Sequence, residues 1–365
     1  MIKIPFYKPT IFENIFNVDS STLDLAVEEL EKKFKDITNS NFVLSVNNPS
    51  SALHLTLCAL DLKRGDKVIC PVNSYVDIPE AIRHFDSEPI FTDIEPKSYN
   101  ISIDSLERAI KENKSKKLRA IVVPHFSGLK GDIKPILELA KANKLVVIED
   151  FTSSSVSESR VDIDGDIAIF SLNYKLDNTL KGATISFKSE KFYNRAKLLR
   201  EHGLVDTKKD VSYIYDIVDI GCDYRLDNLS AYFLNWLLSK RDSLIKKRVE
   251  IANVYFKNLK DVNHVTLPIE SKEHQYSYFI IEIDKNRDAF ARELKSKGIE
   301  VGLHYIPLNF TTYYKKKYGL KIFNFPNAMS AYQKVMSIPC NSKMSEDEAL
   351  YISKAIKEVA SRHIW

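Results

Sequence analysis

The chain has 365 residues, of which 44% are hydrophobic and 28% charged, and its formal net charge at neutral pH is +4. Such a chain can bury a large core, and its balanced, dispersed charges give no sign of a nucleic-acid-binding surface. The four cysteines are far apart, the eight histidines form no HExxH pair, and no run suits a signal peptide or a membrane span, so we expect a cytoplasmic protein with reduced thiols and no metal site.

The first predicted element is an amphipathic helix over residues 22–37, in which apolar residues recur at helical spacing. After it, short apolar runs alternate with helical segments. The predicted strands are 41–46, 67–70, 88–92, 120–124, 145–149, 167–171 and 183–187. The predicted helices between them are 50–60, 78–85, 103–112 and 133–143. This alternation indicates a mostly parallel α/β sheet with helices on both faces, which binds ligands at the carboxyl ends of its strands.

Beyond residue 226 the pattern changes to a long helical stretch over 226–259. Two further strands are predicted at 277–283 and 301–305, and a closing helix at 346–361. We therefore expect a large α/β domain over residues 1–250 and a small C-terminal α+β domain over residues 251–365.

Two neighbouring strand ends carry residues that suggest a chemistry. One apolar strand ends at Glu149-Asp150, and the next ends at Ser171 and is followed by Lys175. A buried aspartate and a lysine in these places suit pyridoxal phosphate (PLP). The carboxylate would pair with the pyridinium nitrogen, the lysine would form a Schiff base, and the serine could bind phosphate.

Other residues fit around this pair. Ser50 and Ser51 open a predicted helix, where main-chain N–H groups and the helix dipole favour a phosphate. Tyr75 follows a predicted strand and could stack on a cofactor ring. Each position also has an ordinary explanation, because Asp150 and Ser50 suit helix N-caps and a tyrosine at a strand end more often only packs.

In order and spacing these motifs resemble the DegT-type family of nucleotide-sugar aminotransferases, which are fold-type I PLP enzymes with an aspartate-aminotransferase-like fold. The resemblance covers nearly the whole chain. Its motifs are NPSSALHL at 48–55, GDKVICP at 65–71 with Ser74-Tyr75, PHFSG at 124–128, Glu149-Asp150, LREHG at 199–203, DYRL at 223–226, GLHYIPL at 302–308 and SIP at 337–339.

The resemblance implies roles for the cofactor-binding residues. Lys175 would hold PLP and later move the proton, Asp150 would keep the ring nitrogen protonated, and Tyr75 would stack on the ring. The phosphate would be held by three hydroxyl groups, those of Ser50, Ser51 and Ser171.

The resemblance also implies a substrate and a partner. His304 and Tyr305 would lie near the nucleotide, and the loop with Asp223 and Arg225 would reach across a homodimer into the partner's site. Family members usually pass an amino group from glutamate to a keto group of a nucleotide-linked deoxysugar, in the biosynthesis of lipopolysaccharide and other surface polysaccharides.

The cofactor site departs from the family pattern at several positions. Pro49 replaces a glycine, Ser153 stands where a glutamine touches the PLP hydroxyl, and Asp223 replaces an asparagine that donates to the phosphate. Lys175 follows Ser171 by four residues instead of five, which a one-residue deletion explains. Lys181, just before Gly182, is the second candidate for the Schiff-base lysine.

These departures leave two alternatives open. The chain could be a degenerate family member without PLP chemistry, which binds a nucleotide sugar or supports a catalytic paralogue. It could also be a PLP-dependent sugar dehydratase. We rank the dehydratase third, because family members of that kind replace the lysine by histidine and no histidine lies in residues 170–183.

Overall fold

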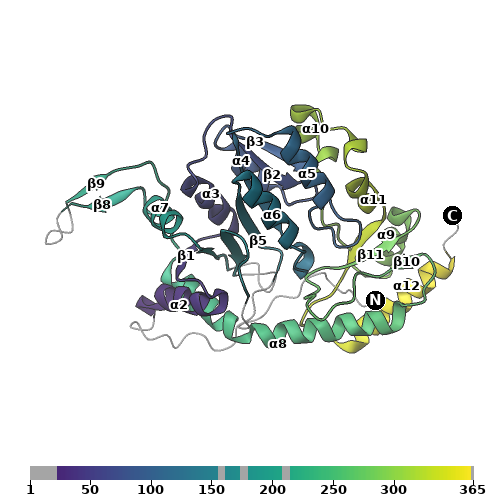
Figure 1. Ribbon diagram of the computed structural model, residues 1–365. Helices are drawn as coiled ribbons and strands as arrows, with labels where there is room; N and C mark the ends of the chain where they lie inside the picture. The colour runs from purple at the N-terminus through teal and green to yellow at the C-terminus, as the bar shows by residue number, and fades with distance from the viewer. Residues whose placement is uncertain (1–22, 155–160, 173–179, 208–213, 363–365) are drawn as a thin grey trace.

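The computed structural model describes residues 23–154, 161–172, 180–207 and 214–362 (Figure 1). In this part of the chain the largest sheet has the strand order β1-β7-β6-β5-β4-β2-β3. Its strands are β1 (Phe42–Val46), β2 (Lys67–Pro71), β3 (Glu88–Thr92), β4 (Leu118–Pro124), β5 (Val146–Phe151), β6 (Ile167–Ser171) and β7 (Ala183–Phe187). The strands from β3 to β6 run parallel, and β7 pairs antiparallel with β6 and β1. The predicted α/β class with a mostly parallel sheet is confirmed.

Helices cover both faces of this sheet (Figure 1). They are α2 (Ala26–Thr38), α3 (Pro49–Ala59), α4 (Asp77–Arg83), α5 (Ile103–Glu112), α6 (Lys134–Asn143) and α7 (Glu190–Arg200). Side chains of a strand point alternately to opposite faces, so both faces of a central strand are apolar. In β4, Ala120 and Val122 belong to the core around α3, whereas Ile121 and Val123 belong to the core around α5 and α6.

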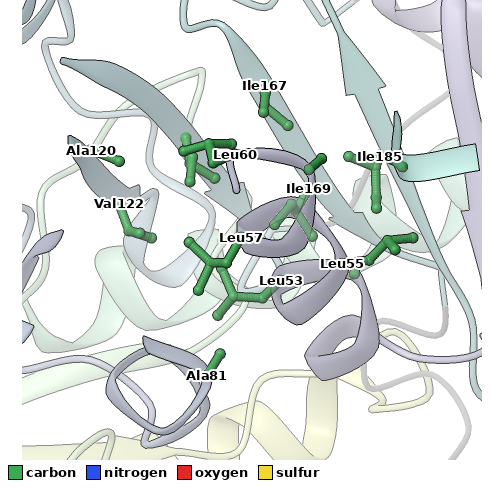
Figure 2. Packing of buried hydrophobic residues seen from close by; sticks show 14 of the residues in the cluster. Leu53, Leu55, Leu57, Leu60, Ala81, Ala120, Val122, Ile167, Ile169 and Ile185 are labelled. Carbon is green, nitrogen blue, oxygen red and sulfur yellow. The ribbon is translucent and has the colours of Figure 1, made fainter. Parts of the chain in front are cut away.

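Most residues of helix α3 are buried, and its N-terminus lines the candidate site. Figure 2 shows Leu53 and Leu57 packed among apolar side chains of the central strands. The side chain of Asn48 caps the helix by accepting a hydrogen bond from Ser51 N at 2.9 Å. Pro49 occupies the first turn, where its missing N–H removes no helical hydrogen bond.

The C-terminal part of the chain has its own antiparallel sheet of β10 (Val265–Thr266), β11 (Phe279–Ile283) and β12 (Val335–Ile338). The helices in and beside this part are α9 (Arg287–Ser296), α10 (Thr312–Tyr318), α11 (Pro326–Lys334) and α12 (Glu346–Arg362). Short 3₁₀ turns lie in this part at η2 (Leu308–Phe310) and η3 (Ile322–Asn324), and a third, η1 (Phe126–Gly128), follows β4 of the large sheet. This arrangement matches the α+β unit that the sequence predicts.

The long predicted helical stretch is one continuous helix, α8 (Asn228–Leu259), which runs beneath both parts of the molecule (Figure 1). Residues of α8 up to Leu238 pack with α2, whereas those from Ile251 onward pack against β11 and α12. A domain boundary at residue 250 therefore falls inside a helix, and the division stays a prediction. None of the described helices has the length and apolar character needed to cross a bilayer.

One predicted strand is wrong. Residues 301–305 form a single bridge between Gly302 and Ser337 and no extended ladder. The segment leaves the edge of β12 because its next side chains pack elsewhere: the ring of His304 stacks on Tyr278 at 3.6 Å, and Tyr305 hydrogen-bonds the same residue. This departure from the sheet places both side chains at the candidate site.

Candidate active site

A cavity of about 530 Å³ lies at the carboxyl ends of β2, β4, β5 and β6. Most of its lining comes from residues before Gly182, and Tyr278, His304 and Tyr305 from the C-terminal part line it as well. Among the residues that the sequence singles out, those that line this cavity are Ser50, Tyr75, Asp150, Ser153, Ser171, Lys181, His304 and Tyr305. The topology thus brings together residues from six widely separated segments.

Asp150 lies at the end of β5 and is buried beside the cavity. Its Oδ1 accepts a hydrogen bond from Thr152 N at 2.7 Å. Burial raises the pKa of Asp150, while the hydrogen bonds with Thr152 and the nearby His125 oppose that shift. A cationic group bound in the cavity would stabilise the ionised carboxylate, so Asp150 suits a protonated ring nitrogen.

A buried pair beneath the cavity fixes the strand ends around Asp150. His125 Nε2 lies 2.9 Å from Glu149 Oε2, and both side chains are completely buried. Glu149 Oε1 also accepts hydrogen bonds from the N–H groups of Asp164 and Gly165, at 2.7 and 2.6 Å. The His125 N–H donates to the carbonyl of Asp150, so this network holds the backbone that carries the carboxylate.

Aromatic side chains from both parts of the chain surround the mouth of the cavity. The ring of Tyr75 is half exposed and lies 5.5 Å from the ring of Tyr305. The hydroxyl groups of Tyr278 and Tyr305 are 3.1 Å apart, and His304 Nδ1 lies 2.8 Å from Ser337 Oγ. An exposed aromatic face such as that of Tyr75 can cover a flat ligand ring.

Ser74 is a residue of the candidate site that the sequence did not predict, although it directly precedes Tyr75, which was predicted. Its side chain is buried and lines the cavity, and its Oγ has no hydrogen-bond partner among the described residues. A buried hydroxyl without a partner is costly unless a ligand satisfies it. Ser171, at the end of β6, also lines the cavity, and the buried Arg241 of α8 donates to its carbonyl at 3.2 Å.

Asp77 is the second missed residue. It lies in the first turn of α4, lines the cavity, and its Oδ2 accepts a hydrogen bond from Ser50 Oγ at 3.4 Å. Burial raises the pKa of Asp77 to about 7, and the charge of Asp150 adds to the shift. In the sequence Asp77 looks like an ordinary acidic residue at a helix start, and no pattern marks it as facing a cavity.

Other predicted residues lie away from the cavity or cannot be placed. Ser51 is buried, and its N–H is used by the Asn48 cap. Asp223 and Arg225 are exposed and paired with each other at 3.1 Å outside the cavity of their own chain. The hydrogen bond from Arg225 lowers the pKa of Asp223. Lys175, the predicted Schiff-base lysine, lies outside the described residues, whereas Lys181 lines the cavity.

The residues present fit PLP. A buried carboxylate, an aromatic face, an amine and an unpartnered buried hydroxyl meet in one cavity that also contains the N-terminus of α3. A second cavity of about 720 Å³ adjoins the first, because Ser74, Tyr75 and Tyr305 line both. Arg83 and Tyr313 also line this second cavity. The combined space exceeds what a cofactor of this size needs.

The chain is similar to known proteins over nearly its whole length. MJ1066 of Methanocaldococcus jannaschii, described as an uncharacterized protein, is 30% identical over 384 aligned positions that cover 99% of this chain and 98% of the relative. GDP-perosamine synthase of Escherichia coli O157:H7 is 28% identical, in an alignment that covers 98% of this chain and 99% of the relative. The spore coat polysaccharide biosynthesis protein SpsC of Bacillus subtilis is 26% identical, in an alignment that covers 91% of this chain and 89% of the relative.

The solved structures show the same fold. The PLP form of the putative sugar aminotransferase Spr1654 from Streptococcus pneumoniae superimposes with a TM-score of 0.87, at 22% identity and full coverage of both chains. Helicobacter pylori PseC, an aminotransferase involved in pseudoaminic acid biosynthesis, gives a TM-score of 0.86 at 18% identity, and the superposition covers 99% of this chain and 100% of PseC. The family model for DegT/DnrJ/EryC1/StrS aminotransferases matches residues 12–357, and the chain therefore belongs to that family.

Proposed function

We propose that this protein is a PLP-dependent aminotransferase that moves an amino group from glutamate to a keto group of a nucleotide-linked deoxysugar, in the biosynthesis of a surface polysaccharide such as lipopolysaccharide. The observation that carries the proposal is one cavity in which Asp150, Ser74, Tyr75 and Lys181 meet beside the N-terminus of α3. Relatives named for GDP-perosamine synthesis and spore coat polysaccharide biosynthesis support the choice of substrate class.

Bound PLP would supply an electron sink, and the protein would supply position, charge and proton transfer. Asp150 would keep a proton on the ring nitrogen, and Tyr75 would cover one face of the ring. Ser74, Ser171 and Ser50 would donate hydrogen bonds, while Thr152 holds the Asp150 carboxylate in place. A lysine, Lys175 by the family pattern or Lys181 by its place in the cavity, would move the proton at the substrate carbon.

The adjoining cavity supports a substrate larger than an amino acid. It adds about 720 Å³ next to Tyr75 and Tyr305, and its lining includes Arg83 and the aromatic Tyr313 and Tyr314. A basic group and aromatic faces suit the charged phosphates and the flat base of a nucleotide. We place the nucleotide part of the substrate here and its sugar nearer Asp150.

We also propose that the protein acts as a homodimer. The hairpin of β8 (Leu204–Asp206) and β9 (Tyr215–Ile217) extends away from the body of the molecule (Figure 1). Its large apolar side chains, and those just beyond it, are exposed: Leu204, Tyr215, Ile217, Val218 and Ile220. An exposed apolar patch of this kind marks an interaction site. The nearby loop with Asp223 and Arg225 would complete the partner's cavity.

The test is the visible absorbance of the purified protein after incubation with PLP, followed by borohydride reduction and peptide mapping. We expect a yellow protein with the pyridoxyl group trapped on Lys175, and Lys175→Ala should abolish trapping while Lys188→Ala, on the surface after β7, should not. Trapping on Lys181 would leave the proposed function unchanged and would make Lys181, instead of Lys175, the Schiff-base lysine.

A colourless protein without a modified lysine would favour the alternative, a family member that binds a nucleotide sugar or supports a paralogue without PLP chemistry. Two observations favour this second candidate: Pro49 offers no N–H group to a phosphate, and the Asp77 carboxyl group lies beside Ser50. A product that has lost a hydroxyl group instead of gaining an amine would point to the dehydratase.

A further inference from the structure

The N-terminus of α3 offers few donors to an anion. Pro49 has no N–H, and Ser51 N donates to Asn48 Oδ1 at 2.9 Å. Ala52 N donates to the carbonyl of Asn48 at 3.1 Å. In this turn, the described hydrogen bonds leave the N–H of Ser50 as the open main-chain donor, so a phosphate there needs donors from side chains.

A carboxyl group from the next helix lies within hydrogen-bond distance of this turn. Asp77 Oδ2 is 3.4 Å from Ser50 Oγ, and both residues line the cavity. An ionised Asp77 would compete for the Ser50 hydroxyl and repel a phosphate, whereas a protonated Asp77 would add an O–H donor. The protonation state of this one side chain therefore decides whether this end of the cavity attracts or repels a phosphate.

The charges that act on Asp77 favour its neutral form. Asp150 faces it from β5, and Glu80 lies one turn along α4. The other titratable groups that line the cavity are Tyr75, Lys181, Tyr278, His304 and Tyr305. Burial and then the Asp150 charge raise the pKa of Asp77 to about 7, against the opposing hydrogen bonds from Ser50 and Ile78. A bound phosphate dianion would favour the neutral acid further, since it adds negative charge.

We propose that Asp77 binds the phosphate group of the cofactor as the neutral acid and donates a hydrogen bond to a phosphate oxygen, so that cofactor binding takes up a proton from solvent wherever Asp77 is ionised in the free protein. This inference rests on the proposed function and adds a specificity-determining residue to it. The one bond that forms is the O–H bond of Asp77, when a proton from solvent joins its carboxylate, and no bond to the cofactor is made or broken. Binding should weaken as the pH rises above 7, since an ever smaller fraction of Asp77 carries that proton.

The experiment compares pyridoxamine 5′-phosphate with pyridoxamine by isothermal titration calorimetry of the full chain at pH 6.5, 7.5 and 8.5. Neither ligand has an aldehyde, so the result does not depend on which lysine reacts. The two ligands share the ring and the amine, so the pH dependence caused by these groups cancels in the ratio of the two affinities. What remains in the ratio is the pH dependence of phosphate binding. Titrations in two buffers with different ionisation heats count the protons taken up.

We expect the affinity ratio of the wild type to fall by about tenfold between pH 7.5 and 8.5, the limit for one required proton. Asp77→Asn, a permanent neutral donor, should give a nearly flat ratio and take up about one proton fewer at pH 8.5. Asp77→Ser, which keeps a donor without the charge, should behave in the same way. Glu107→Gln, a charge change at an exposed position of α5 outside both cavities, should follow the wild type.

An identical pH dependence in the wild type and in both Asp77 variants would overturn the proposal while leaving the cofactor site intact. Failure of a folded wild-type protein to bind either ligand at any pH would overturn this inference together with the proposed cofactor. The two failures are distinguishable, because only the second abolishes binding of pyridoxamine phosphate.

Discussion

At the scale of single residues, Ser74 is a buried hydroxyl group without a partner among the described residues, and it faces the cavity. Ser74→Ala removes no hydrogen bond that the described residues make, so we expect the free energy of unfolding to change by less than about 1 kcal/mol. A hydrogen bond to a charged ligand contributes about 1.5–3 kcal/mol, so affinity for pyridoxamine phosphate should fall by roughly tenfold to a hundredfold.

The matched control for Ser74→Ala is Ser277→Ala. Ser277 Oγ is also buried and unpartnered in the described part of the chain, but it does not line the cavity. Calorimetry and urea denaturation of both variants provide the comparison. An affinity that falls equally in both variants, or in neither, would contradict a ligand-binding role for Ser74.

The buried pair of His125 and Glu149 supports a second prediction at this scale. Glu149→Ala leaves His125 and the N–H groups of Asp164 and Gly165 without their acceptor, and breaking such a buried network costs about 3–5 kcal/mol. Glu29→Ala is the control, because Glu29 pairs with Lys33 on the exposed face of α2 and such pairs contribute at most about 1 kcal/mol. Equal midpoints of urea unfolding for the two variants would contradict this assignment.

At the scale of elements, Asp66 ties the start of β2 to the start of β4. Its carboxylate is buried and accepts from Lys63 N at 3.0 Å, with Lys117 Nζ at 3.1 Å and Arg119 Nη1 at 2.7 Å. Burial alone would raise the pKa of Asp66, but the Lys63 N–H and the two cations outweigh it, so the pKa lies below its usual value.

Because the pKa of Asp66 is lower in the folded than in the unfolded state, its ionised carboxylate stabilises the fold at pH values above the unfolded pKa of about 3.9. This contribution disappears as the pH falls through the folded pKa. Asp66→Asn should therefore lower the free energy of unfolding by about 1–3 kcal/mol at pH 7, and the difference should vanish near pH 2. The exposed Asp86→Asn is the control and should show little change at either pH. A difference that persists in acid would contradict the ionic role.

The elements differ in how well the sequence predicts them. The strands at 88–92, 167–171 and 183–187 have the predicted bounds, because short apolar runs between turn residues leave little freedom in placing a buried strand. Residues 301–305 have the same local character, yet their conformation depends on the contacts of His304 and Tyr305 with Tyr278. Such long-range aromatic contacts leave no local pattern.

The same distinction holds for the site. The positions of Asp150, Ser50, Tyr75 and Ser171 at the cavity could be predicted because each follows or ends a strand, and the carboxyl ends of those strands meet at one edge of the sheet. The proposed roles of Ser74 and Asp77 could not, because they depend on a missing or a shared hydrogen-bond partner. Those properties exist only once α3, α4 and β5 are packed together.

At the scale of the whole molecule, the exposed apolar side chains around the hairpin of β8 and β9 predict a homodimer. Ile220 is 92% exposed in the isolated chain, and we expect the partner to cover it. Light scattering coupled to size exclusion should therefore give the wild type about twice the chain mass of 41.9 kDa. Ile220→Asp should give the mass of one chain, because a charge buried without a partner in the interface costs several kcal/mol.

Phe323→Asp is the matched control for the interface. Phe323 is 81% exposed and belongs to η3, which lies between α10 and α11 in the chain. These two helices lie far from the hairpin (Figure 1), so this variant should stay dimeric. Because the loop with Asp223 and Arg225 would complete the partner's cavity, the Ile220→Asp monomer should also bind pyridoxamine phosphate more weakly than the Phe323→Asp dimer. A monomeric wild type, or an Ile220→Asp dimer with undiminished affinity, would contradict a site shared through this hairpin.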